Sequence, residues 1–149
     1  MPSSSNYLAV RPDCLARRHE EPFDPDLRII DAHHHLWTGL ALRELASCPN
    51  IRIKIGGVGM RITGFGFERG EDPPTSEELA TAWRPYVETA IEAFRADRCM
   101  FASDFPVDKG SYGYDMVWNA FKRLTGAASA SGREALISGM AERTYRPGL

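Results

Sequence analysis

The sequence predicts an α/β fold in which short parallel strands are covered by helices. Three apolar runs of strand length, each followed by polar residues or glycine, carry this prediction. Helical patterns separate the runs, and such an alternation of strand and helix is typical of a parallel sheet with helices packed on its face. The predicted strands are Arg28–His35, Ile51–Ile55 and Cys99–Ser103.

Capping signals and apolar spacing predict the helices between these strands. A short helix over Leu40–Ser47 is closed by Pro49 and Asn50. Thr75 and Glu78 have the spacing of a capping box that opens a longer helix, which Pro85 is expected to interrupt or restart. The apolar stripe of that helix favours a core position over a cofactor contact: Val87, Ala90, Ile91 and Phe94.

The last third of the chain repeats this pattern twice. One helical stripe ends at Gly126, and Ser131 with Glu134 forms a second capping-box pattern that predicts a final helix. The two stripes consist of Val117, Phe121 and Leu124, and of Leu136, Ile137, Met140 and Ala141.

The composition narrows the function classes. The chain has 149 residues, and its 43% hydrophobic and 26% charged residues indicate a globular domain, which we place at residues 26–149. Residues 1–25 are polar, lack the apolar run of a signal peptide or membrane span, and are expected to be a mobile leader. A formal net charge of −2 with scattered basic residues argues against nucleic acid as a partner, and nothing favours a membrane.

The three cysteines are widely spaced and form no C-x-x-C pair. They therefore indicate neither a disulfide framework nor a cysteine zinc site, and reduced thiols in a cytoplasmic protein are the simplest interpretation. These residues are Cys14, Cys48 and Cys99.

A glycine-rich stretch lies between Ile55 and Thr75 and also contains arginine and phenylalanine. A segment of this length without its own secondary structure is typical of an active-site lid or of a mobile loop. Gly57 and Gly59 could suggest a dinucleotide-binding loop, but Ile62 stands where the third glycine would fall, so we do not favour a nucleotide.

Two histidines at the end of the first predicted strand are candidate metal ligands. Side chains alternate along a strand, so His33 and His35 share a face while His34 lies on the other. Two imidazoles can share one divalent ion if further ligands come from elsewhere in the fold. The alternative is a polar strand end without a metal.

The same alternation places polar side chains of the other two strands. The isoleucines of Ile51–Ile55 share the face expected to pack on helices, which leaves Lys54 on the opposite face, where it could bind a substrate carboxylate. Asp104 emerges at the end of the third strand; its simpler interpretation is a residue that initiates a turn. Imidazole, ammonium and carboxylate groups could thus meet at one end of a sheet.

These segments together resemble the amidohydrolase superfamily, in the lactonase-like branch of predicted TIM-barrel metal-dependent hydrolases. Asp31–Trp37 resembles its first-strand H-x-H segment, Ile51–Gly57 its late-strand K-[IL]-[SG]-G segment, and Met100–Lys109 its final S-[DN]-[FW]-P segment. The match continues through Trp118–Arg123 and covers about residues 26–147. The resemblance implies a partial (β/α)8 barrel with the first strand and the last strands and helices, because no counterpart of the middle strands is found after Trp37.

The resemblance also implies a function. It predicts a hydrolase of a lactone or related cyclic ester, with Asp104 as general base and Lys54 binding a small carboxylated substrate. His33, His35 and Asp104 would hold a divalent metal ion, zinc first, although metal-free chemistry is known in the family.

The missing middle strands favour two alternatives. One is a catalytically inactive, shortened relative that buries its open sheet edges in a homo-oligomer. The other is a module that binds a metal without turnover.

Overall fold

The two described strands form a small parallel sheet at the centre of the structure. The computed structural model describes residues 39–146, so the predicted strand Arg28–His35 and the leader lie outside the described residues. Strand β1 (Ile53–Ile55) pairs with β2 (Cys99–Phe101), in the register Ile53 with Cys99 and Ile55 with Phe101. Both strands fall within the predicted ranges, and the parallel pairing of an α/β fold is confirmed.

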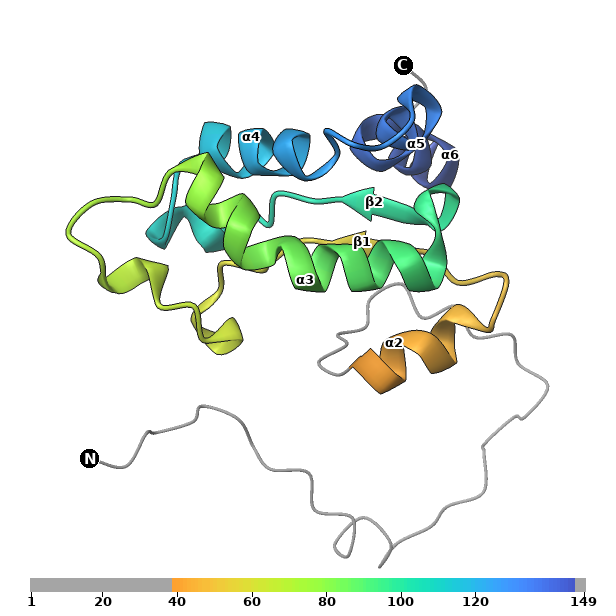
Figure 1. Ribbon diagram of the computed structural model, residues 1–149, viewed down its shortest axis with the longest axis horizontal. Helices are drawn as coiled ribbons and strands as arrows, with labels where there is room; N and C mark the ends of the chain where they lie inside the picture. Colours follow the sequence, from red (N-terminus) through yellow and green to blue (C-terminus); the bar gives the residue numbers. More distant parts are fainter. Residues whose placement is uncertain (1–38, 147–149) are drawn as a thin grey trace, which may run out of the picture. The chain divides into compact units, whose positions relative to one another are not determined.

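Helices cover this sheet (Figure 1). Helix α3 (Ser76–Phe94) connects the two strands, and α2 (Gly39–Ala46) packs on α3. Helix α4 (Tyr114–Leu124) follows β2 and packs along α3. The chain then continues through α5 (Ala130–Glu134), a π-helical turn (Ala135–Gly139) and α6 (Met140–Tyr145). None of the helices within residues 39–146 combines the length and apolarity needed to cross a membrane.

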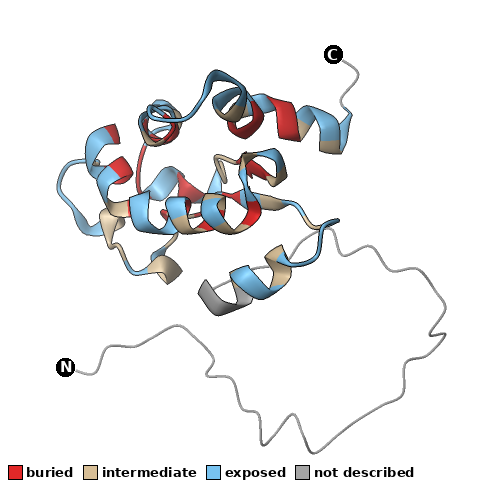
Figure 2. Ribbon diagram, turned by 45° about the vertical axis from the view of Figure 1, so that its right-hand side comes forward, coloured by how far each residue is buried: buried red, intermediate tan, exposed pale blue. Residues whose placement is uncertain are grey.

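Aromatic side chains dominate the core between the sheet, α3 and α4. Phe101 of β2 stacks on Phe121 of α4 with ring centroids 4.2 Å apart. Trp83 of α3 contacts Phe121 at 5.7 Å and Tyr112 at 5.4 Å. Residues of α3 and α4 belong to one core cluster, so the predicted apolar stripes of these helices do form the core. Figure 2 marks the buried residues in red.

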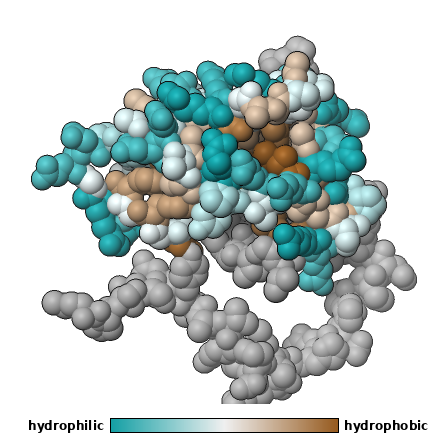
Figure 3. All heavy atoms as spheres, viewed as in Figure 1, coloured by the Kyte–Doolittle hydropathy of each residue, from teal (hydrophilic) through white to brown (hydrophobic). Residues whose placement is uncertain are grey.

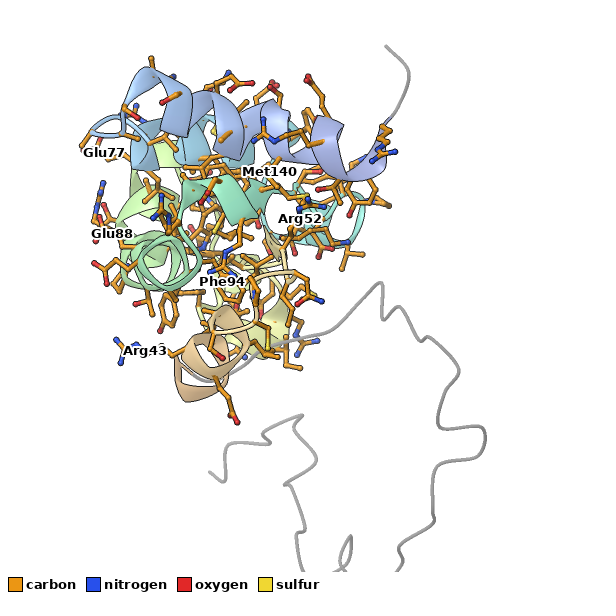
Figure 4. The ribbon with its side chains drawn as sticks, turned by 90° about the vertical axis from the view of Figure 1, so that its right-hand side faces the viewer. Arg43, Arg52, Glu77, Glu88, Phe94 and Met140 are labelled. Atoms are coloured by element: carbon orange, nitrogen blue, oxygen red, sulfur yellow. The ribbon has the colours of Figure 1, made fainter. Side chains whose placement is uncertain are left out.

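A second, smaller cluster lies on the side of β2 that carries Met100. Met100 is buried with Ala135 and Met140 of the last helical segment. In Figure 4, Met140 and Phe94 lie on different sides of the strands, while Glu77 and Glu88 lie on the outer side of α3. Both faces of β2 are therefore covered at the height of Met100.

Helix α3 begins as predicted but is not interrupted. Thr75 accepts a hydrogen bond from the Glu78 backbone, and the Glu78 side chain accepts one from the Thr75 backbone, which completes the capping box. The helix continues through Pro85, so the prediction of an interruption is wrong. Proline leaves the carbonyl of Thr81 without its intrahelical donor, but both residues are exposed, where water can supply the missing bond.

The start of the last helical segment also differs from the prediction. The cap is Ser129, whose hydroxyl accepts a hydrogen bond from the Gly132 backbone at 3.1 Å. Ser131 lies inside α5. Either serine could cap the helix, and the spacing of Ser131 and Glu134 matched a capping box, so the sequence favoured Ser131 over Ser129.

The glycine-rich stretch has more structure than its sequence predicts. It contains two 3₁₀ turns, Arg61–Thr63 and Phe67–Arg69. Phe65 stacks on Phe67 with centroids 5.5 Å apart and meets Tyr86 of α3 edge-on at 5.6 Å. Figure 3 shows hydrophobic residues in the middle of one face and at its left side, surrounded by hydrophilic residues.

Candidate functional site

The loops that follow β1 and β2 meet at the carboxyl ends of the strands. The Ala102 backbone N–H donates to the carbonyl of Ile55 at 3.0 Å, which carries the strand pairing one residue further. Gly56 lies directly against Ala102: a Cβ at Gly56 would come within 2.3 Å of the Ala102 carbonyl oxygen. Glycine at this position therefore lets the two loops leave the sheet side by side.

Asp104 stands at this junction. Its backbone has a φ of 58°, in the left-handed region that residues with a Cβ adopt at a cost of roughly 1–2 kcal/mol. Its Oδ2 is buried, has no hydrogen-bond partner among the described residues, and lies over Gly57, 3.1 Å from where a Cβ would be. The carboxylate that the sequence predicted to emerge at the strand end is thus turned toward the loop after β1.

Lys54 lies on the face of β1 that the sequence predicted. Ile53 and Ile55, its neighbours along the strand, belong to the hydrophobic core, and Lys54 is exposed. In the parallel ladder Lys54 pairs with Met100, two residues before the end of the pairing at Ala102. Lys54 and Asp104 therefore belong to neighbouring strands, with Asp104 further toward the carboxyl end.

A buried acid and phenol lie beside Asp104. Asp108 is 2% exposed, and its Oδ2 accepts a hydrogen bond of 2.5 Å from the hydroxyl of Tyr112, which is also 2% exposed. Burial raises the pKa of Asp108 above its usual range, and the negative charge of Asp104 raises it further, against the hydrogen bond from Tyr112. Burial likewise raises the pKa of Tyr112, with the hydrogen bond to Asp108 as a second cause. The pair is held together in a site from which water is excluded.

Tyr112 and Ser111 also touch the loop after β1. The Ser111 hydroxyl donates to the carbonyl of Gly59 at 3.0 Å in a buried position. A Cβ at Gly59 would lie 2.2 Å from the Tyr112 ring, so only glycine leaves room for it. The two loops are therefore joined at Gly57 by Asp104 and at Gly59 by Ser111 and Tyr112.

The structure describes only one of the three predicted metal ligands, Asp104. All four histidines precede residue 39, so His33 and His35 lie outside the described residues. Within residues 39–146 no group of three or more His, Cys, Asp or Glu side chains could hold a metal ion. Cys99 is buried, and burial raises the pKa of its thiol to about 12.

The sequence pointed to Asp104 and Lys54 but not to Asp108, Tyr112 or Gly59. Asp108 and Tyr112 have the i,i+4 spacing of a local pair, which was a usable signal. Their burial depends on Gly59, which lies some fifty residues earlier and cannot be placed from spacing.

Comparison with known proteins identifies the family of the chain. The sequence model of the amidohydrolase family matches residues 21–146. An uncharacterized protein of Sinorhizobium fredii, y4mH, is 42% identical over 132 residues, which are 82% of this chain and 40% of that protein. An L-fucono-1,5-lactonase of Burkholderia multivorans is 33% identical over 106 residues, which are 70% of this chain and 33% of that protein. The chain thus spans between a third and two fifths of the length of these relatives.

Solved structures resemble the same part of the chain. A crystal structure of an amidohydrolase from Burkholderia multivorans with bound zinc matches with a TM-score of 0.61 and 32% identity, over 72% of this chain and 36% of that one. A second crystal form, with bound HEPES, matches with the same TM-score and 31% identity. From the family match over most of its length and these relatives, the chain belongs to the amidohydrolase family.

Proposed function

We propose that this chain hydrolyses a lactone or a related cyclic ester, with Asp104 as the general base that activates the attacking water. The observation that carries the proposal is the carboxylate of Asp104. It sits at a strand end on a left-handed backbone, with one buried oxygen that no group within residues 39–146 satisfies. Such a conformation costs stability, and costs of this kind concentrate at functional sites.

The proposed reaction needs little beyond this carboxylate. Water attacks the carbonyl carbon of the lactone while Asp104 takes its proton. The tetrahedral intermediate then breaks the ring C–O bond, and the proton passes to the departing alkoxide, which yields a hydroxy acid. The L-fucono-1,5-lactonase relative supports a sugar lactone as the first substrate to test.

We propose that Lys54 orients the substrate. The face of β1 opposite the core carries its ammonium group, which is exposed and can pair with the carboxylate of an acidic lactone or with the carboxylate that ring opening forms. Its place on the strand next to Asp104 supports this role.

We propose that His33, His35 and Asp104 bind a divalent metal ion, with zinc as the first candidate. The unpartnered buried oxygen of Asp104 fits a metal ligand, and two imidazoles with one carboxylate are a donor set that zinc accepts. When bound, the ion would supply Lewis-acid polarisation of the carbonyl. Asp104 can act as the base with or without it.

We further propose that the fold is a segment of a (β/α)8 barrel, formed by the first strand and the last strands and helices. The parallel pairing of β1 with β2, and the similarity to 36% of a larger amidohydrolase, support this. The small-molecule substrate would bind at the carboxyl ends of the strands. A homo-oligomer could cover sheet edges that two strands leave open.

A second candidate is a catalytically inactive, shortened relative that is retained for structure, oligomer formation or metal binding. The observation that favours it is the length of the chain, which spans 40% and 33% of the two curated relatives. The described residues contain two strands of a fold that normally has eight.

Lactone turnover by the purified chain separates the two candidates. L-fucono-1,5-lactone and related aldono-lactones would be supplied with and without zinc, and acid release followed at constant pH. In the hydrolase, Asp104→Asn lowers kcat by about 10²–10⁴, the usual contribution of a general base. Asp115→Asn, which removes an exposed carboxylate of α4, is the matched control and keeps the rate.

Equal rates in the Asp104→Asn variant and the unmodified chain would contradict Asp104 as the base. A folded chain that turns over none of these lactones would favour the inactive relative. Metal uptake that is lost in His33→Ala, again without turnover, would assign the chain to metal binding alone.

A further inference from the structure

We propose that Asp108 and Tyr112 form a clamp that fixes the loop after β1 against the loop after β2 and so positions the carboxylate of Asp104. The proposal rests on the function proposed above, which makes Asp104 the general base. Asp108 and Tyr112 are positioning residues in it, because both are only 2% exposed and act through the position of Asp104.

The first contact of the clamp lies within the loop after β2. The Asp108 backbone N–H donates to the carbonyl of Asp104 at 3.3 Å, and that of Tyr112 donates to the carbonyl of Asp108 at 3.3 Å. These bonds close the turn in which Asp104 takes its left-handed conformation. The turn alone, however, does not fix Asp104 relative to β1.

The second contact is the side-chain bond between Tyr112 and Asp108. It is 2.5 Å long and buried, so water does not compete for either group. The Tyr112 ring also makes an edge-to-face contact with Trp83 of α3, with ring centroids 5.4 Å apart. Tyr112 is thereby fixed at both its ring and its hydroxyl.

The third contact reaches across to the other loop. Gly59 lies so close to the Tyr112 ring that a Cβ would overlap it, and the carbonyl of Gly59 accepts a hydrogen bond from Ser111 at 3.0 Å. Two residues earlier, Gly57 lies under the carboxylate of Asp104. The contacts therefore form a closed ring from Asp104 through Asp108, Tyr112 and Gly59 back to Gly57 and Asp104.

The geometry of this ring explains an otherwise costly arrangement. Burial of the Asp108 carboxyl raises its pKa and is unfavourable for folding, and hydrogen bonds from Tyr112 and from the Gly59 backbone act against that rise. If Asp108 served only to close the turn, its backbone would suffice. Its side chain is needed to hold the hydroxyl of Tyr112, and through Tyr112 the loop that faces Asp104.

Hydrogen–deuterium exchange of the full chain tests the clamp without reference to catalysis. Tyr112→Phe removes only the hydroxyl, and we expect amide exchange across residues 56–70 to rise at least about tenfold, with exchange in α3 unchanged. Asp108→Ala should act in the same way. Asp108→Asn keeps an oxygen acceptor for Tyr112 and should restore slow exchange. Tyr145→Phe, which alters an exposed tyrosine of α6, is the matched control.

Kinetics of the same variants test the positioning of Asp104. Where the unmodified chain hydrolyses a lactone, Tyr112→Phe and Asp108→Ala should lower kcat by about tenfold and leave KM within about twofold, with Asp108→Asn restoring kcat. Loop exchange that rises in a chain without lactone turnover would support the clamp and contradict the proposed function.

Two results would overturn the clamp. One is unchanged exchange over residues 56–70 in Tyr112→Phe. The other is faster exchange throughout the described helices, which would show that the pair contributes only general stability.

Discussion

The core beneath α3 and α4 and the loops at the carboxyl ends of β1 and β2 are built differently. In the core, stacked rings such as Phe101 and Phe121 exclude water over regular helices and strands. In the loops, Asp104 has a left-handed backbone and glycines allow contacts that no other residue would. Within residues 39–146, buried side-chain polar atoms without a partner include carboxylate oxygens of Glu68 and Asp104 in the loops, and the indole nitrogens of Trp83 and Trp118 in the helices.

This difference separates residues that stabilise the fold from residues that cost stability. Burial of a large aromatic side chain contributes a few kcal/mol, whereas an unpartnered buried carboxylate oxygen is destabilising. The acidic groups among them lie in the segments that follow β1 and β2, which is where the function proposed above places the reaction.

The largest effect is expected in the core. Phe121→Ala should reduce the free energy of unfolding by about 3–5 kcal/mol, because Phe121 contacts Phe101, Trp83 and Trp118 and its removal leaves a cavity. Urea unfolding measures the change, and Tyr145→Ala, at an exposed aromatic residue, is the control. A loss below about 1 kcal/mol would mean that the aromatic cluster is not the centre of stability.

A smaller loss of stability is expected in the loops. Gly59→Ala should cost about 1–3 kcal/mol, since the new methyl group meets the Tyr112 ring and that ring is buried and hydrogen-bonded, so it cannot move away freely. Gly110→Ala is the matched control, because no atom lies within 4 Å of the added Cβ. Equal unfolding curves for the two variants would show that the loop after β1 does not pack against Tyr112 as described.

The same comparison explains which features the sequence could predict. The capping box at Thr75 and the stripe of Val87 and Phe94 depend on residues a few positions apart, and both are confirmed. Strand alternation predicted that Lys54 lies on the face of β1 opposite the isoleucines. By contrast, Ser111 and Gly59 are 52 residues apart, so their contact depends on tertiary structure that spacing does not encode. The predicted interruption of the helix at Pro85 was wrong for another reason. Water at this exposed position can donate to the carbonyl that proline leaves without a donor.

The smallest effect, and the sharpest test of the buried acid, is the pH dependence of stability. Burial raises the pKa of Asp108 in the folded chain, so between its unfolded and folded pKa values the folded chain binds more protons than the unfolded chain. Stability therefore falls as pH rises through this window. Below the unfolded pKa the acid is neutral in both states and has no such effect.

Asp108→Asn removes this titration while keeping an acceptor for Tyr112. We expect the Asn variant to gain stability relative to the unmodified chain as the pH is raised from about 3 to 7, by less than the losses expected above. Urea unfolding at each pH measures the gap, and subtracting the profile of Asp115→Asn removes the effect of one unit of net charge. If the stability of Asp108→Asn instead decreased relative to that of the unmodified chain as the pH rises, Asp108 would be stabilised as a charged group. The loops at the strand ends would then resemble the core in being built for stability, and the contrast between the two regions would fail at its most buried acid.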